Sequence, residues 1–291
     1  MPKELFTGGS PLCAGCMASL GLKLALNTLG KNTIVINASG CMTLLSVYPN
    51  SPMRVPFIHV AIENSAAVAT GIYSAYKQRG EHVNILIYAG DGATYDIGLQ
   101  SLSGACDRRD DFLYICYNNQ AFMNTGIQQS SATPLGARTT TTPCGKENKM
   151  GNLLQRKPME KIMAAHGIPY VATACVSFPE DFMEKIRKAS HIVGPKFIDL
   201  LCPCTTGWGF DSSDGVEIGK LAVQTGLWPL YEIERGKLKI THKLNKLRPL
   251  RDYFSRQKRF KHLESKQVNM IKNIVEKRWN ELLDGDFYGI R

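Results

Sequence analysis

Apolar runs alternate with amphipathic or alanine-rich segments along most of the chain. Five runs rich in β-branched residues predict buried strands at residues 31–40, 82–92, 111–119, 168–175 and 195–204. The segments between them predict helices at residues 62–80, 96–108, 159–167 and 178–194. Strands that alternate with helices are typical of an α/β fold with a mostly parallel sheet and helices on both faces. Ligands of such sheets bind beyond the carboxyl ends of the strands.

Two segments fall outside this alternation. From about Met123 to Leu154 the chain shows no helical or strand pattern, and loops of that length are usually functional or covered by a partner. Residues 236–291 form a basic C-terminal extension to an α/β domain that we place at residues 1–235. Its last part has apolar residues at helical spacing, which predicts one apolar helical face: Leu263, Val268, Ile271, Ile274, Val275 and Trp279. That face needs a partner surface, either this chain's own body or another subunit.

Charge is distributed unevenly along the 291 residues. The net charge is +10, and the stretch from Gly236 to Asn280 holds 14 Lys or Arg against 3 Asp or Glu, a net of +11. The rest of the chain is therefore near −1, which argues against a nucleic-acid-binding protein. No apolar run reaches 18 residues, so we expect no membrane span. The N-terminus shows no secretory signal pattern, so we expect a cytoplasmic protein, and its nine cysteines are then reduced or bind metal.

Polar residues follow the predicted strands. Asp91 stands between Gly90 and Gly92 after the second strand, and Asn119 lies 28 residues later, after the third. Oxygen ligands of this kind suit Mg²⁺, and the start of the helix after Gly92 would favour a phosphate. The alternative is an ordinary strand-to-helix turn, but the asparagine at the neighbouring strand end favours a metal–diphosphate site.

The cysteines supply a second candidate site. Cys13 and Cys16 form a C-x₂-C pair, and Cys41 and Cys204 each follow a predicted strand. Four thiolates could hold zinc or an iron–sulfur cluster, and the residues alone do not decide between them. Cys202 competes with Cys204 as the fourth ligand. We expect Cys106, Cys116 and Cys175 to be small buried hydrophobes, and Cys144 remains unassigned.

Several motifs resemble a known family. After "GDG" at residues 90–92 come "NTGIQQSSATP" at 124–134 and "CPCTTGW" at 202–208, and "HVAIENSAAVATG" precedes them at 59–71. Together they resemble the β subunit of 2-oxoacid:ferredoxin oxidoreductases, over a span from about Leu12 to Trp279. The resemblance implies a thiamine-diphosphate-binding fold for residues 1–235 and a subunit contact for residues 236–291.

The resemblance also implies roles for individual residues. Asp91 and Asn119 would bind Mg²⁺ through their side chains, and Ala121 through its backbone carbonyl. Asn124 would face the thiazolium and the substrate, with Thr125 and Gly126 in the same loop. Glu63 would line the cofactor pocket, unless it is only a helix-start carboxylate. The acid that activates the aminopyrimidine is expected on a partner subunit.

For the cysteines, the resemblance favours a [4Fe–4S] cluster on Cys13, Cys16, Cys41 and Cys204, because Cys204 matches the family's Pro-Cys-x-Thr-Gly-Trp pattern. It implies oxidative decarboxylation of a pyruvate-type 2-oxoacid, in which thiamine diphosphate stabilises a carbanion and the cluster takes electrons toward ferredoxin. Coenzyme A then accepts the acyl group. A pyrimidine-binding subunit and a further cluster-carrying subunit complete the enzyme.

Three positions depart from the pyruvate-type pattern. Asn118, Gln120 and Phe122 stand where those relatives commonly carry Asp, Glu and Tyr. A less negative pocket suits a more negative substrate, which adds oxalate as an alternative, although neutral drift explains the change equally well. A zinc-stapled, non-catalytic interaction module is the alternative outside this enzyme class.

Overall fold

A single eight-stranded sheet organises the part of the chain that the computed structural model describes, residues 4–49 and 51–285. Its strand order is β2-β1-β3-β4-β6-β5-β7-β8. All pairs from β2 to β5 are parallel, whereas β7 and β8 are antiparallel. The strands are β1 (Thr33–Ala38), β2 (Phe57–Val60), β3 (Asn84–Gly90), β4 (Phe112–Asn118), β5 (Tyr170–Cys175), β6 (Pro195–Leu201), β7 (Tyr231–Glu234) and β8 (Lys237–Ile240). The mostly parallel α/β fold is confirmed.

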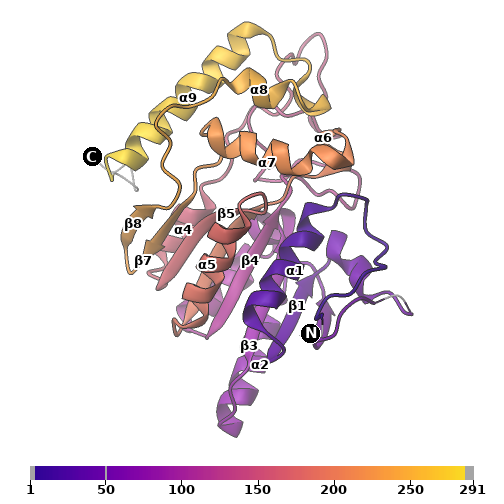
Figure 1. Ribbon diagram of the computed structural model, residues 1–291, viewed down its shortest axis with the longest axis vertical. Coiled ribbons are helices and arrows are strands. Elements are labelled where there is room, and N and C mark those ends of the chain that lie inside the picture. The colour runs from indigo at the N-terminus through magenta and orange to yellow at the C-terminus, as the bar shows by residue number, and fades with distance from the viewer. Residues whose placement is uncertain (1–3, 50, 286–291) are drawn as a thin grey trace.

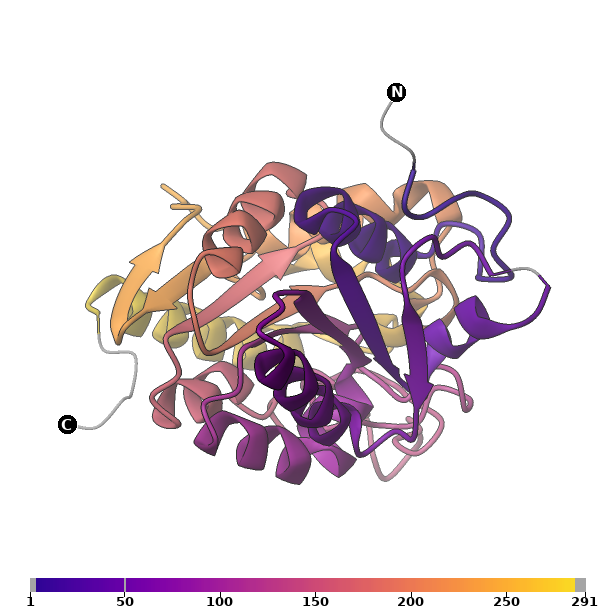
Figure 2. The same ribbon diagram turned by 90° about the horizontal axis from the view of Figure 1, so that it is seen from below.

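Helices cover both faces of the sheet (Figures 1 and 2). One apolar layer joins the sheet to α1 and α5, and a second layer on the opposite face joins it to α2, α3 and α4. The α-helices are α1 (Met17–Leu29), α2 (Ser65–Arg79), α3 (Leu99–Asp107), α4 (Met159–Ala165), α5 (Pro179–Ser190), α6 (Thr205–Trp208), α7 (Gly215–Gln224), α8 (Leu250–Phe254) and α9 (Ser265–Leu283). The short 3₁₀ or π turns are Cys41–Ser46, Gly92–Ile97, Ser212–Asp214 and Lys258–Phe260.

Sequence periodicity did not predict α1, β2 or the β7–β8 hairpin. Strand β2 lies at the edge of the sheet and exposes its two central residues, so it lacks a long apolar run. Arg235 and Gly236 form the two-residue turn of the hairpin, and both have positive φ (47° and 79°), as the hairpin turn that matches strand twist requires. Tyr231, at the start of β7, is buried, whereas β8 is only partly covered.

The C-terminal segment belongs to the same folded body. Helices α7, α8 and α9 lie above one end of the sheet (Figure 1), and Val268, Ile271 and Val275 of α9 share an apolar core with Leu201 at the end of β6. The apolar face of α9 therefore packs on this chain's own body, the first of the two partner surfaces considered above. Residues 286–291 of the extension, like residues 1–3 and 50 of the α/β domain, lie outside the described residues.

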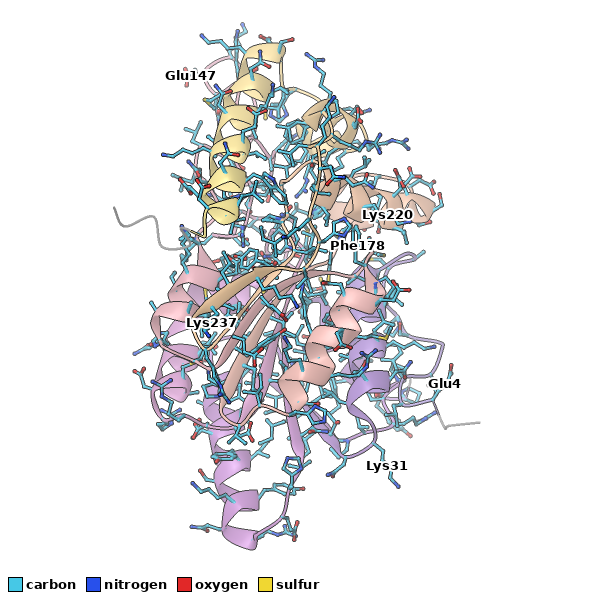
Figure 3. The ribbon with its side chains drawn as sticks, turned by 60° about the vertical axis from the view of Figure 1, so that its left-hand side comes forward. Glu4, Lys31, Glu147, Phe178, Lys220 and Lys237 are labelled. Carbon is cyan, nitrogen blue, oxygen red and sulfur yellow. The ribbon has the colours of Figure 1, made fainter. Side chains whose placement is uncertain are left out.

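The long loop between β4 and α4 contains no helix or strand, as its sequence predicts. It reaches the same end of the molecule as α9, where Figure 3 marks Glu147. The carbonyl of Lys149 accepts a hydrogen bond from the Gln267 side chain of α9 (3.5 Å). Within the loop, the Asn152 side chain donates a hydrogen bond to the Thr133 carbonyl (2.8 Å). No helix among the described residues is both long enough and apolar enough to cross a membrane.

Candidate functional site

Asp91 lies directly beyond β3 and is fully buried. One carboxylate oxygen accepts a hydrogen bond from the Asn119 backbone N–H (3.1 Å), and the other accepts one from the Ser130 hydroxyl. Burial raises the pKa of Asp91 to about 7, although both donors oppose the shift. A carboxylate so far from water is costly unless a cation or further donors compensate it.

Two further oxygens converge on this carboxylate, which makes a group of three. Gly90 and Tyr117 are register partners in β3 and β4, so the two strand ends lie side by side. The Asn119 side-chain amide has its oxygen facing only acceptors, and that position lies 2.9 Å from both Asp91 Oδ1 and the Ala121 carbonyl. With no cation present the amide would rotate and donate to both oxygens. With a cation between them, the three oxygens form a hard ligand set of the kind Mg²⁺ prefers. The donor set therefore fits the predicted metal.

A cavity of about 300 Å³ opens beside these oxygens. Gly92 needs to be glycine here, because a Cβ would lie 2.3 Å from the Phe122 ring that forms part of the wall. The cavity is lined by Ser39, Gly40, Cys41, Thr43, Ile62, Gly90, Gly92, Ala93, Tyr117, Asn119, Ala121, Phe122, Met123, Asn124 and Thr125. Six residues predicted to bind the cofactor or to act in catalysis are among them, namely Gly90, Gly92, Asn119, Ala121, Asn124 and Thr125.

Three other predicted residues do not line this cavity, namely Asp91, which is buried, Gly126 and Glu63. Gly126 turns away, and its carbonyl accepts a hydrogen bond from the Thr140 hydroxyl (2.9 Å). Glu63 is exposed just before α2, and its neighbour Ile62 takes the place on the wall. The helix-start alternative therefore describes the position of Glu63 within this chain, and its contact with a cofactor stays a prediction.

The four predicted cluster cysteines face a second cavity, of about 210 Å³. Cys13 and Cys16 come from the loop before α1, Cys41 from the turn after β1, and Cys204 from the end of β6. Within residues 4–49 and 51–285, no three Cys, His, Asp or Glu side chains are arranged closely enough to hold one metal ion. Each thiolate of a four-iron cluster binds a different iron, so such ligands stand farther apart than those of a single zinc ion.

The two cavities share a wall. Cys41, Asn119, Met123 and Asn124 line both of them. Met123 packs against Gly207 of α6, where a Cβ would lie 2.1 Å from the Met123 sulfur. Asp91, Asn119 and the Ala121 carbonyl form the predicted oxygen site, and Cys13, Cys16, Cys41 and Cys204 form the predicted sulfur site. The two sites are thus immediate neighbours at the carboxyl end of the sheet.

Burial favours the protonated form of three thiols that line this cavity, Cys16, Cys41 and Cys204. It raises the pKa of Cys16 and of Cys204, and it raises that of Cys41 to about 12, with the Cys204 and Cys16 thiols adding to the effect on Cys41. A metal that binds here must displace those protons. Cys202 also lines the cavity, but it is buried in the apolar layer beneath α1, whereas Cys204 Sγ accepts a hydrogen bond from the Gly207 N–H (3.3 Å).

The four remaining cysteines lie away from both cavities, and three of them were predicted to be buried. Cys106, Cys116 and Cys175 are fully buried in the apolar layers, which confirms them as small core residues. Cys144 is half-buried in the long loop and lines neither cavity.

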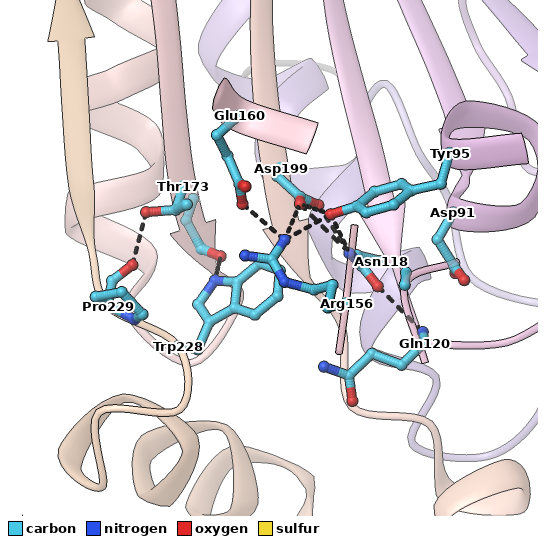
Figure 4. A network of polar contacts seen from close by, with 12 residues as sticks. Asp91, Tyr95, Asn118, Gln120, Arg156, Glu160, Thr173, Asp199, Trp228 and Pro229 are labelled. Atoms are coloured by element: carbon cyan, nitrogen blue, oxygen red, sulfur yellow. Dashed lines mark hydrogen bonds and ion pairs between the residues drawn. The ribbon is translucent and has the colours of Figure 1, made fainter. Parts of the chain in front are cut away.

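Two of the three positions that suggested oxalate do not face the cofactor cavity. Asn118 is buried and donates to Asp199 (3.0 Å) and to the Tyr95 hydroxyl (3.1 Å), within the network of Figure 4. Gln120 accepts from Arg259 (2.8 Å), and its own backbone N–H donates to Asn118. Only Phe122 lines the cavity, so the expectation that all three positions lie beside the substrate is wrong for Asn118 and Gln120.

The Asn118 network fixes the turn that carries the oxygen site. Arg156 donates to Glu160 (2.8 Å), to Tyr95 (2.6 Å) and to Asp199 (3.1 Å), and its guanidinium stacks on the Trp228 ring at 4.6 Å (Figure 4). Burial and the charge of Glu160 raise the pKa of Asp199 to about 8, while Arg156 opposes the shift. Because these hydrogen bonds fix the Asn118 side chain, the residues that follow it, Asn119 and Ala121, are held in position.

Three residues near the site had no predicted role. Ser130 binds Asp91, and the Trp208 indole N–H donates to the Asn119 carbonyl (2.8 Å). Both fall in motifs that carry the family resemblance, "NTGIQQSSATP" and "CPCTTGW". Arg259 has no such signal: it comes from the C-terminal segment, and its guanidinium lies 3.7 Å from the Trp208 ring centre. The predicted extension therefore reaches the site itself.

Comparisons with known proteins agree with this geometry. Residues 38–200 match the thiamine pyrophosphate enzyme family, C-terminal TPP-binding domain. The chain is 52% identical over 285 residues to pyruvate synthase subunit PorB of Methanothermobacter marburgensis, covering 97% of this chain and 99% of that protein. It is 42% identical over 289 residues to ketoisovalerate oxidoreductase subunit VorB of Pyrococcus abyssi, covering 96% and 93%.

A solved structure supports the fold alone. A 2-oxoglutarate:ferredoxin oxidoreductase from Magnetococcus marinus, with 2-oxoglutarate, coenzyme A and succinyl-CoA bound, superposes with a TM-score of 0.59 at 20% identity, over 75% of this chain and 80% of that chain. The family match and the close relatives confirm an oxidoreductase and exclude the non-catalytic interaction module. The chain belongs to the thiamine-diphosphate-binding β subunits of the 2-oxoacid:ferredoxin oxidoreductase family.

Proposed function

We propose that this chain binds thiamine diphosphate with Mg²⁺ and one [4Fe–4S] cluster in its two adjoining cavities, within an enzyme that oxidises pyruvate and reduces ferredoxin. The observation that carries the proposal is the shared wall of Cys41, Asn119, Met123 and Asn124. A one-electron acceptor must lie close to the reacting carbon, and neighbouring cavities provide that proximity.

On the cofactor side, Asp91, Asn119 and the Ala121 carbonyl would hold Mg²⁺, which would in turn bind the diphosphate. Their support is the convergence of three oxygens around the Asn119 amide. Bound thiamine diphosphate supplies the carbanion stabilisation that decarboxylation of a 2-oxoacid requires. Asn124 and Thr125 lie on the same wall, where Asn124 would contact the substrate.

On the sulfur side, Cys13, Cys16, Cys41 and Cys204 would hold the cluster. Cys204 is favoured over Cys202 because Cys204 is only partly buried beside the cavity, whereas Cys202 is buried in the apolar layer beneath α1. The rest of the enzyme would come from a pyrimidine-binding subunit and a further cluster-carrying subunit. Coenzyme A would accept the acyl group.

For the substrate, we favour pyruvate. The relatives at 50–52% identity are named pyruvate synthase subunits, and the ketoisovalerate oxidoreductase subunits are 42% identical. The two positions that would change the pocket's charge, Asn118 and Gln120, do not line the cofactor cavity, so the charge argument for oxalate loses its support. We also propose a cytoplasmic location, with no nucleic-acid or membrane partner.

The test is turnover by the anaerobically purified complex of this chain with its partner subunits. Pyruvate, 2-oxoisovalerate and oxalate would each be supplied with ferredoxin, with and without coenzyme A. We expect coenzyme A-dependent reduction of ferredoxin with pyruvate at the highest kcat/KM. Faster turnover of oxalate without coenzyme A would overturn the assignment, and the Asp91→Ala complex serves as the inactive control.

A further inference from the structure

Arg259 carries a buried positive charge that no carboxylate among residues 4–49 and 51–285 neutralises. The residue is 5% exposed, and its guanidinium donates to three neutral acceptors, the side chains of Gln120 (2.8 Å), Tyr253 (3.1 Å) and Gln257 (2.9 Å). A buried charge without a counter-charge costs free energy. The retention of this arginine in the core therefore needs a reason.

Packing joins Arg259 to the sulfur site. Its guanidinium lies over the Trp208 ring of α6, 3.7 Å from the ring centre. The Trp208 backbone N–H donates to the Cys204 carbonyl (3.0 Å), and the Lys258 N–H donates to the Gly209 carbonyl at the other end of the same helix (3.3 Å). The segment that carries Arg259 is thus fastened to the helix that follows Cys204.

The sulfur cavity has no positive charge of its own. Its lining residues include no Lys, Arg or His within the described part of the chain, and four of them are the predicted cluster cysteines. A cluster held by four thiolates carries net negative charge, which increases when the cluster accepts an electron. Arg259 lies against α6, whose residues Thr205, Thr206 and Gly207 line this cavity.

The two predicted sites differ in the positive charge they lack. Burial lowers the pKa of Arg259 to about 10, which leaves the guanidinium charged at neutral pH, and Tyr253 opposes this shift. Cys204 and Asp91 oppose it as well, so the charge is felt at both sites. The oxygen site would receive positive charge from its own Mg²⁺. The sulfur site would have no separate cation, so the Arg259 charge matters more there.

We infer that Arg259 is the electrostatic partner of the cluster, and that its guanidinium raises the cluster's reduction potential by stabilising the negative charge gained on reduction. The inference rests on the proposed function, since it needs a cluster on these cysteines. In that reaction the substrate-derived carbanion is oxidised and the cluster accepts one electron at a time, while Arg259 exchanges neither a proton nor a bond. A higher potential favours the transfer of electrons from the substrate to the cluster.

The experiment compares the reduction potential of this cluster in the wild-type, Arg259→Gln and Arg259→Lys complexes. A redox titration is followed by electron paramagnetic resonance, and the signal of this cluster is the one missing from the Cys204→Ser complex. For Arg259→Gln we expect the equilibrium constant of one-electron reduction to fall about tenfold, or about 59 mV, as for one unit charge lost from the protein interior. Arg259→Lys keeps the charge and should stay within about twofold of wild type, with all titrations at about pH 6 because a buried lysine loses its proton more readily than arginine.

Two controls separate charge from packing. Tyr253→Phe removes an acceptor of Arg259 without changing any charge, and Arg256→Gln removes a positive charge from an exposed position nearby. Both should leave the equilibrium constant within about twofold of wild type, because exposed charges are screened. Arg259→Gln, Arg259→Lys and Tyr253→Phe should all lower the unfolding midpoint, since each disrupts the hydrogen bonds around the guanidinium.

An unchanged potential in Arg259→Gln, with the cluster present in wild type, overturns this inference and leaves the proposed function intact. Weaker binding of Mg²⁺–thiamine diphosphate in that variant, with an unchanged potential, would assign the charge to the oxygen site instead. An equal fall of the potential in Arg259→Lys or Tyr253→Phe attributes the effect to packing and also overturns the inference.

Loss of the cluster from Arg259→Gln is decided by the lysine variant. Full iron with the wild-type potential in Arg259→Lys would uphold the need for a positive charge, and loss of iron or an altered potential in Arg259→Lys would overturn it. If the wild-type complex itself holds no cluster on these cysteines, the proposed function fails and this inference fails with it.

Discussion

The oxygen site and the sulfur site adjoin each other but are built in different ways. The oxygen site takes Asp91 and Asn119 from two neighbouring parallel strands, so the sheet register alone brings them together. The sulfur site draws Cys13, Cys41 and Cys204 from loops that are far apart in the chain, and the described residues hold no set of thiols closed around one ion. The buried core preforms the oxygen site, whereas the ligands of the sulfur site come from three separate loops or turns.

This difference has an energetic consequence. Asp91 and its partners are buried and hydrogen-bonded before any ligand arrives, so little ordering remains to oppose binding. In the cysteine loops, Cys13 is exposed and Cys16 and Cys41 are only partly buried, so a bound metal would complete the ordering of these loops. We therefore expect thiamine diphosphate binding at the oxygen site to survive loss of the cluster. We expect cluster binding itself to be sensitive to changes in the cysteine loops.

Asp91→Ala is the change expected to have the largest effect. It removes the buried carboxylate from the oxygen set, so Mg²⁺-dependent thiamine diphosphate binding should be abolished while iron remains in place. Cofactor content and iron content of the purified complex would be measured together. Asp107→Ala, at an exposed carboxylate on α3, is the control and should change neither. Tight cofactor binding by Asp91→Ala would remove Asp91 from the metal site.

Serine substitutions at the cluster cysteines come next. Cys13→Ser, Cys16→Ser, Cys41→Ser and Cys204→Ser should each lose most of the iron and the visible absorbance, because each thiolate would bind its own iron. Cys202→Ser and Cys144→Ser should keep both. Full iron in Cys204→Ser together with loss in Cys202→Ser would show that Cys202 is the fourth ligand.

Arg259→Gln tests whether the C-terminal segment stabilises the surroundings of the oxygen site. Arg259 is buried, donates to Gln120 and Tyr253, and has no ion-pair partner among the described residues. Its removal leaves buried acceptors unpaired, so we expect the free energy of unfolding to fall by about 2 kcal/mol. Arg256→Gln removes the same charge from an exposed position nearby and should change it by less than about 0.5 kcal/mol. Equal effects would show that Arg259 supports no part of the site.

The smallest effect concerns the exposed basic faces of α9, which we propose contact an acidic partner such as ferredoxin or another subunit. Lys272→Glu with Lys277→Glu should raise the KM for ferredoxin roughly two- to fivefold at low salt, and the difference should vanish at high salt. Lys31→Glu, at the opposite end of the molecule (Figure 3), is the control. A change that persists at high salt would argue against an electrostatic contact.

The sequence was sufficient for the features that depend on local pattern. The five predicted strands and four predicted helices are present, and the rule that parallel strand ends meet correctly brings Asp91 beside Asn119. Long-range packing was beyond its reach. Arg259 meets Gln120 across 139 positions of the chain, and nothing in the local sequence marks either residue as part of the other's surroundings. Side-chain direction was also beyond reach, because alternation near a strand end does not reveal that Asn118 faces Asp199 rather than the cavity.

The central claim is that this chain holds two independent cofactors on either side of one shared wall. The most direct measurement is iron and thiamine diphosphate content, determined on the same anaerobic preparations of the wild-type, Asp91→Ala and Cys204→Ser complexes. The account predicts that wild type carries both, that Asp91→Ala loses only thiamine diphosphate, and that Cys204→Ser loses only iron. Retention of both cofactors in either variant, or loss of both in Asp91→Ala, would contradict it.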